Sequence, residues 1–261
     1  MNLAGVTPLV GEATSAWKAV QGATGHGSMG GVAVSGVLAE QLARELGDGA
    51  EPGVVHVVDA PPSGAAVAVR VIAAAPTEDD ERFVSAVDSV GTPVVVVQLW
   101  PQADWTPPFV LSPHVVECRA GEGFPVAVIA SRIAEAVERA PLLAARVPTL
   151  RGAVGSRSVY ESVARTSLLA LTGRSRPAIT LEQLRLVSRL RSLELGATEH
   201  EARPTLAATA AALVGSGFAL RAIARSGRRV LPAPMVNAAV AAAGTWALAE
   251  ALRRIGSRSG R

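Results

Sequence analysis

The residues whose types could do chemistry in this chain follow the apolar runs of its N-terminal half. Ser35 and Gly36 close the run that begins at Val32, and Asp59 comes directly after the run VVHVV. A glycine lets a phosphate approach the backbone, and a hydroxyl or carboxylate can ligate a divalent cation. The positions of Ser35, Gly36 and Asp59 therefore make them candidate cofactor-binding residues.

Two further patterns lie in the glycine-rich start of the chain. Gly22 and Gly27 have the Gly-x4-Gly spacing of a phosphate-binding loop, but Ser28 stands where that loop needs lysine. The segment 25–31, GHGSMGG, resembles the nucleophile elbow of α/β-hydrolases with one glycine inserted. An elbow needs a strand before its serine, so a flexible loop explains this segment better. An enzyme, either a serine hydrolase at Ser28 or a nucleotide hydrolase with an atypical phosphate loop, is the alternative function.

The cysteine and histidine content narrows the kinds of site. Cys118 is the only cysteine, which excludes an internal disulfide and a cysteine-rich zinc site. The four histidines have no paired spacing that would hold a metal: His26, His56, His114 and His200. We therefore expect no metal, and because the nucleotide-binding motifs are incomplete, as shown below, we expect no bound cofactor.

The elements that must position the candidate residues alternate between strands and helices. Continuous apolar, valine-rich runs predict strands, and apolar residues at helical spacing between them predict helices. A helix that opens at Thr77 is marked by a capping residue followed by acids. This alternation predicts an α/β fold with a doubly wound, mostly parallel sheet. The expected strands are 32–36, 54–58, 67–74, 94–99 and 115–118, and the expected helices are 37–46, 77–90 and 124–139.

Beyond residue 148 the pattern changes to helices alone. The second of these is predicted to open with a capping box formed by Thr180 and Gln183. The domain organisation we expect is a flexible lead-in over 1–31, an α/β domain over 32–147, an all-helical domain over 148–255 and a disordered tail over 256–261. The expected helices are 152–172, 181–195, 203–226 and 234–255.

Charge divides the chain in the same way. Residues 1–140 hold 16 acidic and 7 basic residues, a net of −9, whereas residues 141–261 hold 6 acidic and 18 basic residues, a net of +12. A basic half suits an acidic partner, namely an anionic membrane surface or an acidic protein. Nucleic acid is disfavoured because the basic half has few aromatic residues for stacking. The first residues lack the features of a signal peptide, which predicts a cytoplasmic protein.

Two groups of side chains are candidates for partner or membrane contact. Trp100 and Trp105 lie in a proline-rich stretch that reads as an exposed loop. Two apolar stretches in the helical half are joined by a segment that contains Arg225, Arg228 and Arg229. The second stretch, 230–252, is long enough to span a bilayer. A buried bundle helix and a hairpin at the inner membrane surface both fit this pattern. Formation of a homo-oligomer also stays open.

Three short motifs give the N-terminal half a resemblance to a known family. The segment Asp59-Ala-Pro-Pro62 comes directly after the apolar run VVHVV, where GTPases carry the Asp-x-x-Gly switch motif after a strand. The segment Gln98-Leu-Trp-Pro101 occupies the place of the guanine-reading Asn-Lys-x-Asp motif. Cys118-Arg-Ala-Gly-Glu-Gly123 stands where Ser-Ala and a glycine turn are found. Residues 32–140 thus resemble a reduced Ras/Era-like GTPase module. The resemblance implies a P-loop-GTPase-like sheet with a nucleotide site at Ser35, Gly36 and Asp59.

The departures from this family concern the residues that do its chemistry. The only lysine of the chain is Lys18, far from the Ser35-Gly36 turn, and Pro62 replaces the glycine whose amide would meet a phosphate. Residues 148–255 are similar to the YcjF-like helical domain, which accompanies bacterial GTPase modules and is described as membrane-associated. Together these features predict a non-catalytic pseudo-GTPase-like protein, with a vestigial nucleotide site, that binds a protein partner or the inner membrane surface.

Overall fold

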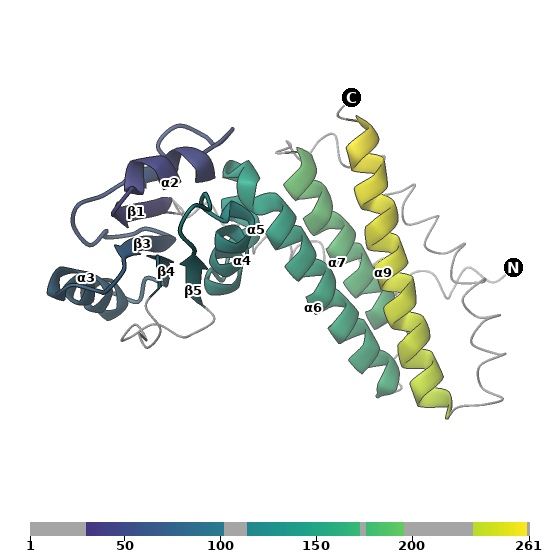
Figure 1. Ribbon diagram of the computed structural model, residues 1–261. Coiled ribbons are helices and arrows are strands. Elements are labelled where there is room, and N and C mark those ends of the chain that lie inside the picture. Colours follow the sequence, from purple (N-terminus) through teal and green to yellow (C-terminus); the bar gives the residue numbers. More distant parts are fainter. Residues whose placement is uncertain (1–29, 102–113, 173–175, 196–231, 260–261) are drawn as a thin grey trace, which may run out of the picture. The chain divides into compact units, whose positions relative to one another are not determined.

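The computed structural model describes residues 30–101, 114–172, 176–195 and 232–259. Packing divides the chain into two units, and the division falls between Val154 and Gly155 (Figure 1). One unit contains the strands, and the described part of the other contains helices. Each unit is described by itself below.

The first unit is built on a sheet of five parallel strands, so the protein is of the α/β class. The strand order is β2-β1-β3-β4-β5, which is one of the orders found in doubly wound sheets. The chain crosses back over β1 between β2 and β3, which places the topological switch point between β1 and β3. The strands are β1 (Val32–Gly36), β2 (Val55–Val57), β3 (Val67–Ala73), β4 (Val94–Leu99) and β5 (Val115–Cys118).

The two faces of the sheet bury different side chains because residues alternate along each strand. Ala68 and Ile72 of β3 pack with Phe83 and Val87 of α3 (Glu78–Ser89) on one face. Helices α2 (Ala39–Leu46) and α4 (Val126–Ala136) pack with the strands and with each other. The three central strands are buried along most of their length, as expected for a parallel sheet covered on both faces. Strand β2 is short, lies at the edge and is largely exposed.

Proline positions account for one difference from the predicted helices. The expected helix 124–139 ends at Ala136, and a separate helix, α5 (Ala140–Arg146), begins beside Pro141. A proline in the first turn needs no amide hydrogen bond, so Pro141 starts a helix instead of ending one. A 3-10 turn, η3 (Pro148–Leu150), then leads into the next helix.

The helical unit consists of α6 (Arg151–Leu171), α7 (Arg176–Leu195) and α9 (Ala233–Ser259), with α6 entering from the α/β unit. A core cluster from all three helices holds it together: Val159, Leu186, Val187, Leu190, Ala249 and Leu252. A buried polar contact lies beside this core, where the hydroxyls of Thr166 and Thr245 are 3.2 Å apart and Gln183 donates to Thr245.

Two boundaries in this unit differ from prediction. Helix α7 begins at Arg176, so Thr180 lies inside it and the expected capping box with Gln183 is wrong. The cause is Pro177, whose place in the first turn favours an earlier start. Helix α9 continues to Ser259, into the tail that was expected to be disordered. The predicted helix 203–226 and most of the predicted lead-in 1–31 lie outside the described residues.

Candidate functional site

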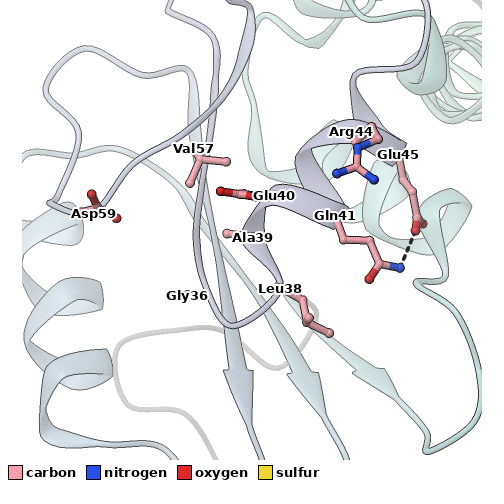
Figure 2. Close-up of a pocket in the computed structure, with 9 residues that line it drawn as sticks. All are labelled: Gly36, Leu38, Ala39, Glu40, Gln41, Arg44, Glu45, Val57 and Asp59. Carbon is pink, nitrogen blue, oxygen red and sulfur yellow. Dashed lines mark hydrogen bonds between the residues drawn. The ribbon is translucent and has the colours of Figure 1, made fainter.

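A pocket lies at the carboxyl ends of β1 and β2, where a parallel sheet places its ligands. Its volume is about 660 Å³. Gly36, Asp59 and residues of α2 line it, and Figure 2 shows Leu38 and Glu40 at the start of the helix and Asp59 on a separate loop. The lining residues are Gly36, Leu38, Ala39, Glu40, Gln41, Arg44, Glu45, Val57 and Asp59. Two of the three predicted cofactor-binding residues, Gly36 and Asp59, are therefore brought together.

Gly36 has a packing role that explains its identity. Its φ is +93°, and a Cβ added there would lie 2.0 Å from the carbonyl oxygen of Val71. The next amide, that of Val37, donates to the same carbonyl at 3.1 Å. The backbone of β1 must therefore pass close to β3 at this point, which only glycine allows. The glycine is accounted for by the sheet without a phosphate.

Ser35 is buried and is not among the residues that line the pocket. Ser35 and Gly36 are consecutive in β1, so they face opposite sides of the sheet. Ser35 is paired in register with Arg70 of β3. The Ser35 hydroxyl has no hydrogen-bond partner within the described structure. A hydroxyl enclosed in this way cannot ligate a metal ion in the pocket, so Ser35 is separated from Gly36 and Asp59 as a functional residue.

The charge of the pocket opposes phosphate binding. Glu40 lies in the first turn of α2, where a phosphate would meet the helix amides, and Glu45 and Asp59 add two further carboxylates. Arg44 is the single basic residue among the described lining residues. Leu38 precedes the helix without a side-chain cap and points away from Glu40 (Figure 2). At neutral pH the lining thus carries more negative than positive charge, which repels anions.

The residues in the place of the base-reading motif are used in two other ways. Gln98 is buried, and its Nε2 donates to the carbonyl of Ala74 at 3.1 Å. Trp100 is 49% exposed and has a φ of 52°. Gln98 therefore holds the end of β3 against β4, whereas Trp100 is presented at the surface. Trp105 lies outside the described residues.

The acidic run at residues 78–81 contains a buried ion pair that sequence reasoning missed. Asp80 accepts from Nε of Arg70 at 2.8 Å, and from the amide and hydroxyl of Thr77 at 2.9 and 2.7 Å. The arginine also lies over the ring of Phe83, 4.8 Å from its centroid. Acids that follow a helix cap usually face solvent, but Asp80 is buried. The spacing Thr77-x-x-Asp80 is the capping-box signal that could have revealed it.

These contacts also shift the ionisation of two groups. Burial raises the pKa of Asp80, but the hydrogen bonds from Thr77 and the charge of Arg70 outweigh burial and lower that pKa below its usual range. Burial raises the pKa of the Cys118 thiol, as do the nearby carboxylates of Glu122 and Glu45. Cys118 is thus a buried thiol held by backbone carbonyls. The described residues contain no cluster of three or more metal-ligating side chains.

The helical unit carries a long apolar helix. Ala233–Leu252 of α9 is long and apolar enough to cross a bilayer, with a mean hydropathy of 1.3, and 22% of its most apolar window is buried. The predicted contact residues Arg225, Arg228 and Arg229, and the alternative nucleophile Ser28, lie outside the described residues.

No family model, curated protein or solved structure matches this chain.

Proposed function

We propose that this chain is a non-catalytic, pseudo-GTPase-like protein that binds a protein partner or the inner membrane surface through its basic helical half. The observation that carries the proposal is the composition of the pocket at the ends of β1 and β2. Three carboxylates, from Glu40, Glu45 and Asp59, line the pocket in which a nucleotide site would need lysine and backbone amides. A polyphosphate would enter this pocket against net negative charge.

The architecture supports the proposal only at the level of the fold. A parallel sheet in the order β2-β1-β3-β4-β5 agrees with a P-loop-GTPase-like, doubly wound domain. Many unrelated activities share such sheets, so the residues carry more weight than the strand order. Gly36 is explained by its contact with Val71, and Pro62 has no amide to offer a phosphate.

Titration with mant-GTP or mant-ATP in the presence of Mg²⁺ tests the loss of nucleotide binding. We expect no saturable fluorescence change in the micromolar range for the full chain. Micromolar binding that Asp59→Ala abolishes, and that the exposed control Asp88→Ala leaves intact, would overturn the proposal.

The helical half supplies the binding surface in this proposal. Large apolar side chains of α6 and α9 are exposed, and the rings of Tyr160 and Trp246 meet at 5.6 Å between centroids. Aromatic side chains with one polar end suit both protein interfaces and the membrane–water boundary. The other exposed members are Leu168, Leu171 and Met235.

Sedimentation with vesicles of anionic phospholipid, and with neutral vesicles as control, separates the two kinds of partner. Leu168→Glu should abolish pelleting if this face meets lipid, because it places a charge on an exposed apolar side chain. Val90→Glu, on the other unit, is the matched control. Absence of pelleting together with failure to co-purify any partner would refute a binding function for this half.

A further inference from the structure

A second surface, on the α/β unit, shows features of a binding site. Four large apolar side chains are 42 to 49% exposed at the carboxyl ends of β1, β2 and β4: Val37, Leu38, Val57 and Trp100. Among the described residues of this unit, Val90 is exposed at the end of α3, away from that edge, and Val128 is exposed in the first turn of α4, after β5. We call Val37, Leu38, Val57 and Trp100 the carboxyl-edge patch. It lies beside the switch point of the sheet, where α/β proteins bind their ligands.

The backbone under this patch is held in an unfavourable conformation. In the described residues three non-glycine residues have positive φ, and all three follow the carboxyl ends of strands: Leu38 at 56° after β1, Ala74 at 52° after β3 and Trp100 at 52° after β4. Such a conformation is unfavourable for a residue with a side chain and persists only where the surrounding structure enforces it. Hydrogen bonds between strands hold two of these residues in place. The amide of Ala74 donates to the carbonyl of Leu99, and the amide of Trp100 donates to the carbonyl of Cys118.

The size of the carboxyl-edge patch fits a helix. Strands β1 and β4 are separated by β3 alone, and adjacent strands lie about 4.8 Å apart, so their ends are about 10 Å apart. This is close to the diameter of an α-helix with its side chains, which is about 10–12 Å. Trp100 at one side of the patch and Leu38 at the other could therefore contact one apolar helix face.

The charge around the carboxyl-edge patch selects the kind of helix. Asp59 follows β2, Glu40 opens α2 after β1, and Glu78 and Asp79 open α3 after β3. All four acids are exposed, but Glu78 and Asp79 form ion pairs with Arg82 at 3.5 and 3.1 Å, so Glu40 and Asp59 supply most of the net negative charge of this rim. An apolar centre with a rim of carboxylates is complementary to a segment with apolar anchors and basic flanks.

We propose that the carboxyl-edge patch binds a basic amphipathic helix of a protein partner, with Trp100 and Leu38 as its apolar anchors. This surface is distinct from the helical half and does not depend on whether that half binds lipid or protein. It would occupy the edge at which a nucleotide-binding relative would hold its ligand.

Fluorescence anisotropy of a labelled synthetic peptide tests the inference on the full chain. The probe is a leucine–arginine helix of about five turns, and the control is a scrambled peptide of the same composition. We expect saturable binding of the probe that weakens as salt rises, because salt screens the acidic rim. Trp100→Asn should weaken binding by about tenfold or more, and Glu40→Gln combined with Asp59→Asn should weaken it severalfold.

Substitution by asparagine separates binding from folding. Asparagine tolerates positive φ and is a preferred helix N-cap, so Leu38→Asn should lower affinity without lowering the thermal midpoint. Val90→Asn, which changes a still more exposed apolar residue outside the patch, should leave affinity unchanged.

Equal binding of the probe and the scrambled peptide, or no loss of affinity in Trp100→Asn, would overturn the inference. It would also be overturned if Trp100→Asn converted a dimer to a monomer in analytical ultracentrifugation while peptide affinity stayed unchanged. A second copy of the chain would then be the occupant. None of these results bears on mant-nucleotide binding, so the proposed function stands or fails separately.

Discussion

Removal of the Asp80 carboxylate tests whether the buried pair with Arg70 holds the α/β unit together. Asp80→Ala takes away the acceptor of four contacts: Arg70 Nε at 2.8 Å, Arg70 Nη2 at 2.7 Å, and the amide and hydroxyl of Thr77. The guanidinium would stay behind on β3, where its side chain is 14% exposed, with only the ring of Phe83 as a described partner. The substitution thus leaves a largely buried charge without its counter-ion.

The structure gives the size of the expected effect. Breaking a buried ion pair by removal of one partner costs about 3–5 kcal/mol, and the amide and hydroxyl of Thr77 also lose their acceptor, although Thr77 still caps the helix. Because the pair is not fully enclosed, we expect a total of about 3–4 kcal/mol. Domains of this kind are stable by about 5–15 kcal/mol, so the loss should be readily measured.

Urea unfolding followed by circular dichroism measures this loss on the full chain. Asp79→Ala is the matched control, because Asp79 is the neighbouring acid, is 77% exposed and pairs with Arg82 at 3.1 Å. That control should change the unfolding free energy by about 0–1 kcal/mol. Adding Arg70→Met to Asp80→Ala should recover part of the loss, since no buried charge stays unpaired. Equal shifts for Asp79→Ala and Asp80→Ala would refute the reasoning.

Four further outcomes follow from the same geometry. The pKa of Asp80 is lower in the folded protein than in the unfolded chain. Its contribution to the free energy of unfolding is therefore complete above about pH 4 and is lost as pH falls through the folded pKa. Urea unfolding should show that the difference in stability between wild type and Asp80→Ala is smaller at acid pH than at neutral pH. Gly36→Ala should lose about 1–3 kcal/mol or more, because the new Cβ meets the carbonyl of Val71 at positive φ. Leu186→Ala should cost the helical unit about 2–5 kcal/mol in the same assay. Cys118 should react with a thiol reagent only slowly at neutral pH until urea is added, since burial raises its pKa and limits access.

The sheet was predictable because its signal is local. Continuous valine runs gave the bounds of β1, β4 and β5 as they stand, and β3 ends one residue earlier than expected. Strand β2 was predicted over 54–58 and is found over Val55–Val57, although the carbonyl of Val54 and the amide of Val58 also form hydrogen bonds with β1. The acids after Thr77 marked the start of α3 correctly.

The sites were less predictable because they depend on which elements meet. Asp59 and Gly36 were named from their places after strands, and they do share a pocket. Nothing in the local sequence shows that Ser35 faces away from that pocket, or that Glu40 and Glu45 enter it, since this follows from how α2 lies on the sheet. The spacing of Thr77 and Asp80 marks Asp80 as a capping residue, but its partner Arg70 comes from a different element, so the local sequence does not identify the pair itself.

The contact between Thr166 and Thr245 also affects how α9 is aligned along its neighbouring helices. Residues 238–243 of α9 read AAVAAA, and such uniform small side chains would pack almost equally well after a slip of one helical turn, about 5.4 Å. A slip would separate Thr245 from Thr166 and Gln183, so Gln183 would lose its acceptor on α9, whereas each threonine hydroxyl would keep the bond that it donates to a carbonyl of its own helix. The polar contact between the helices therefore favours one register by a modest margin, as a buried polar residue does in a coiled coil.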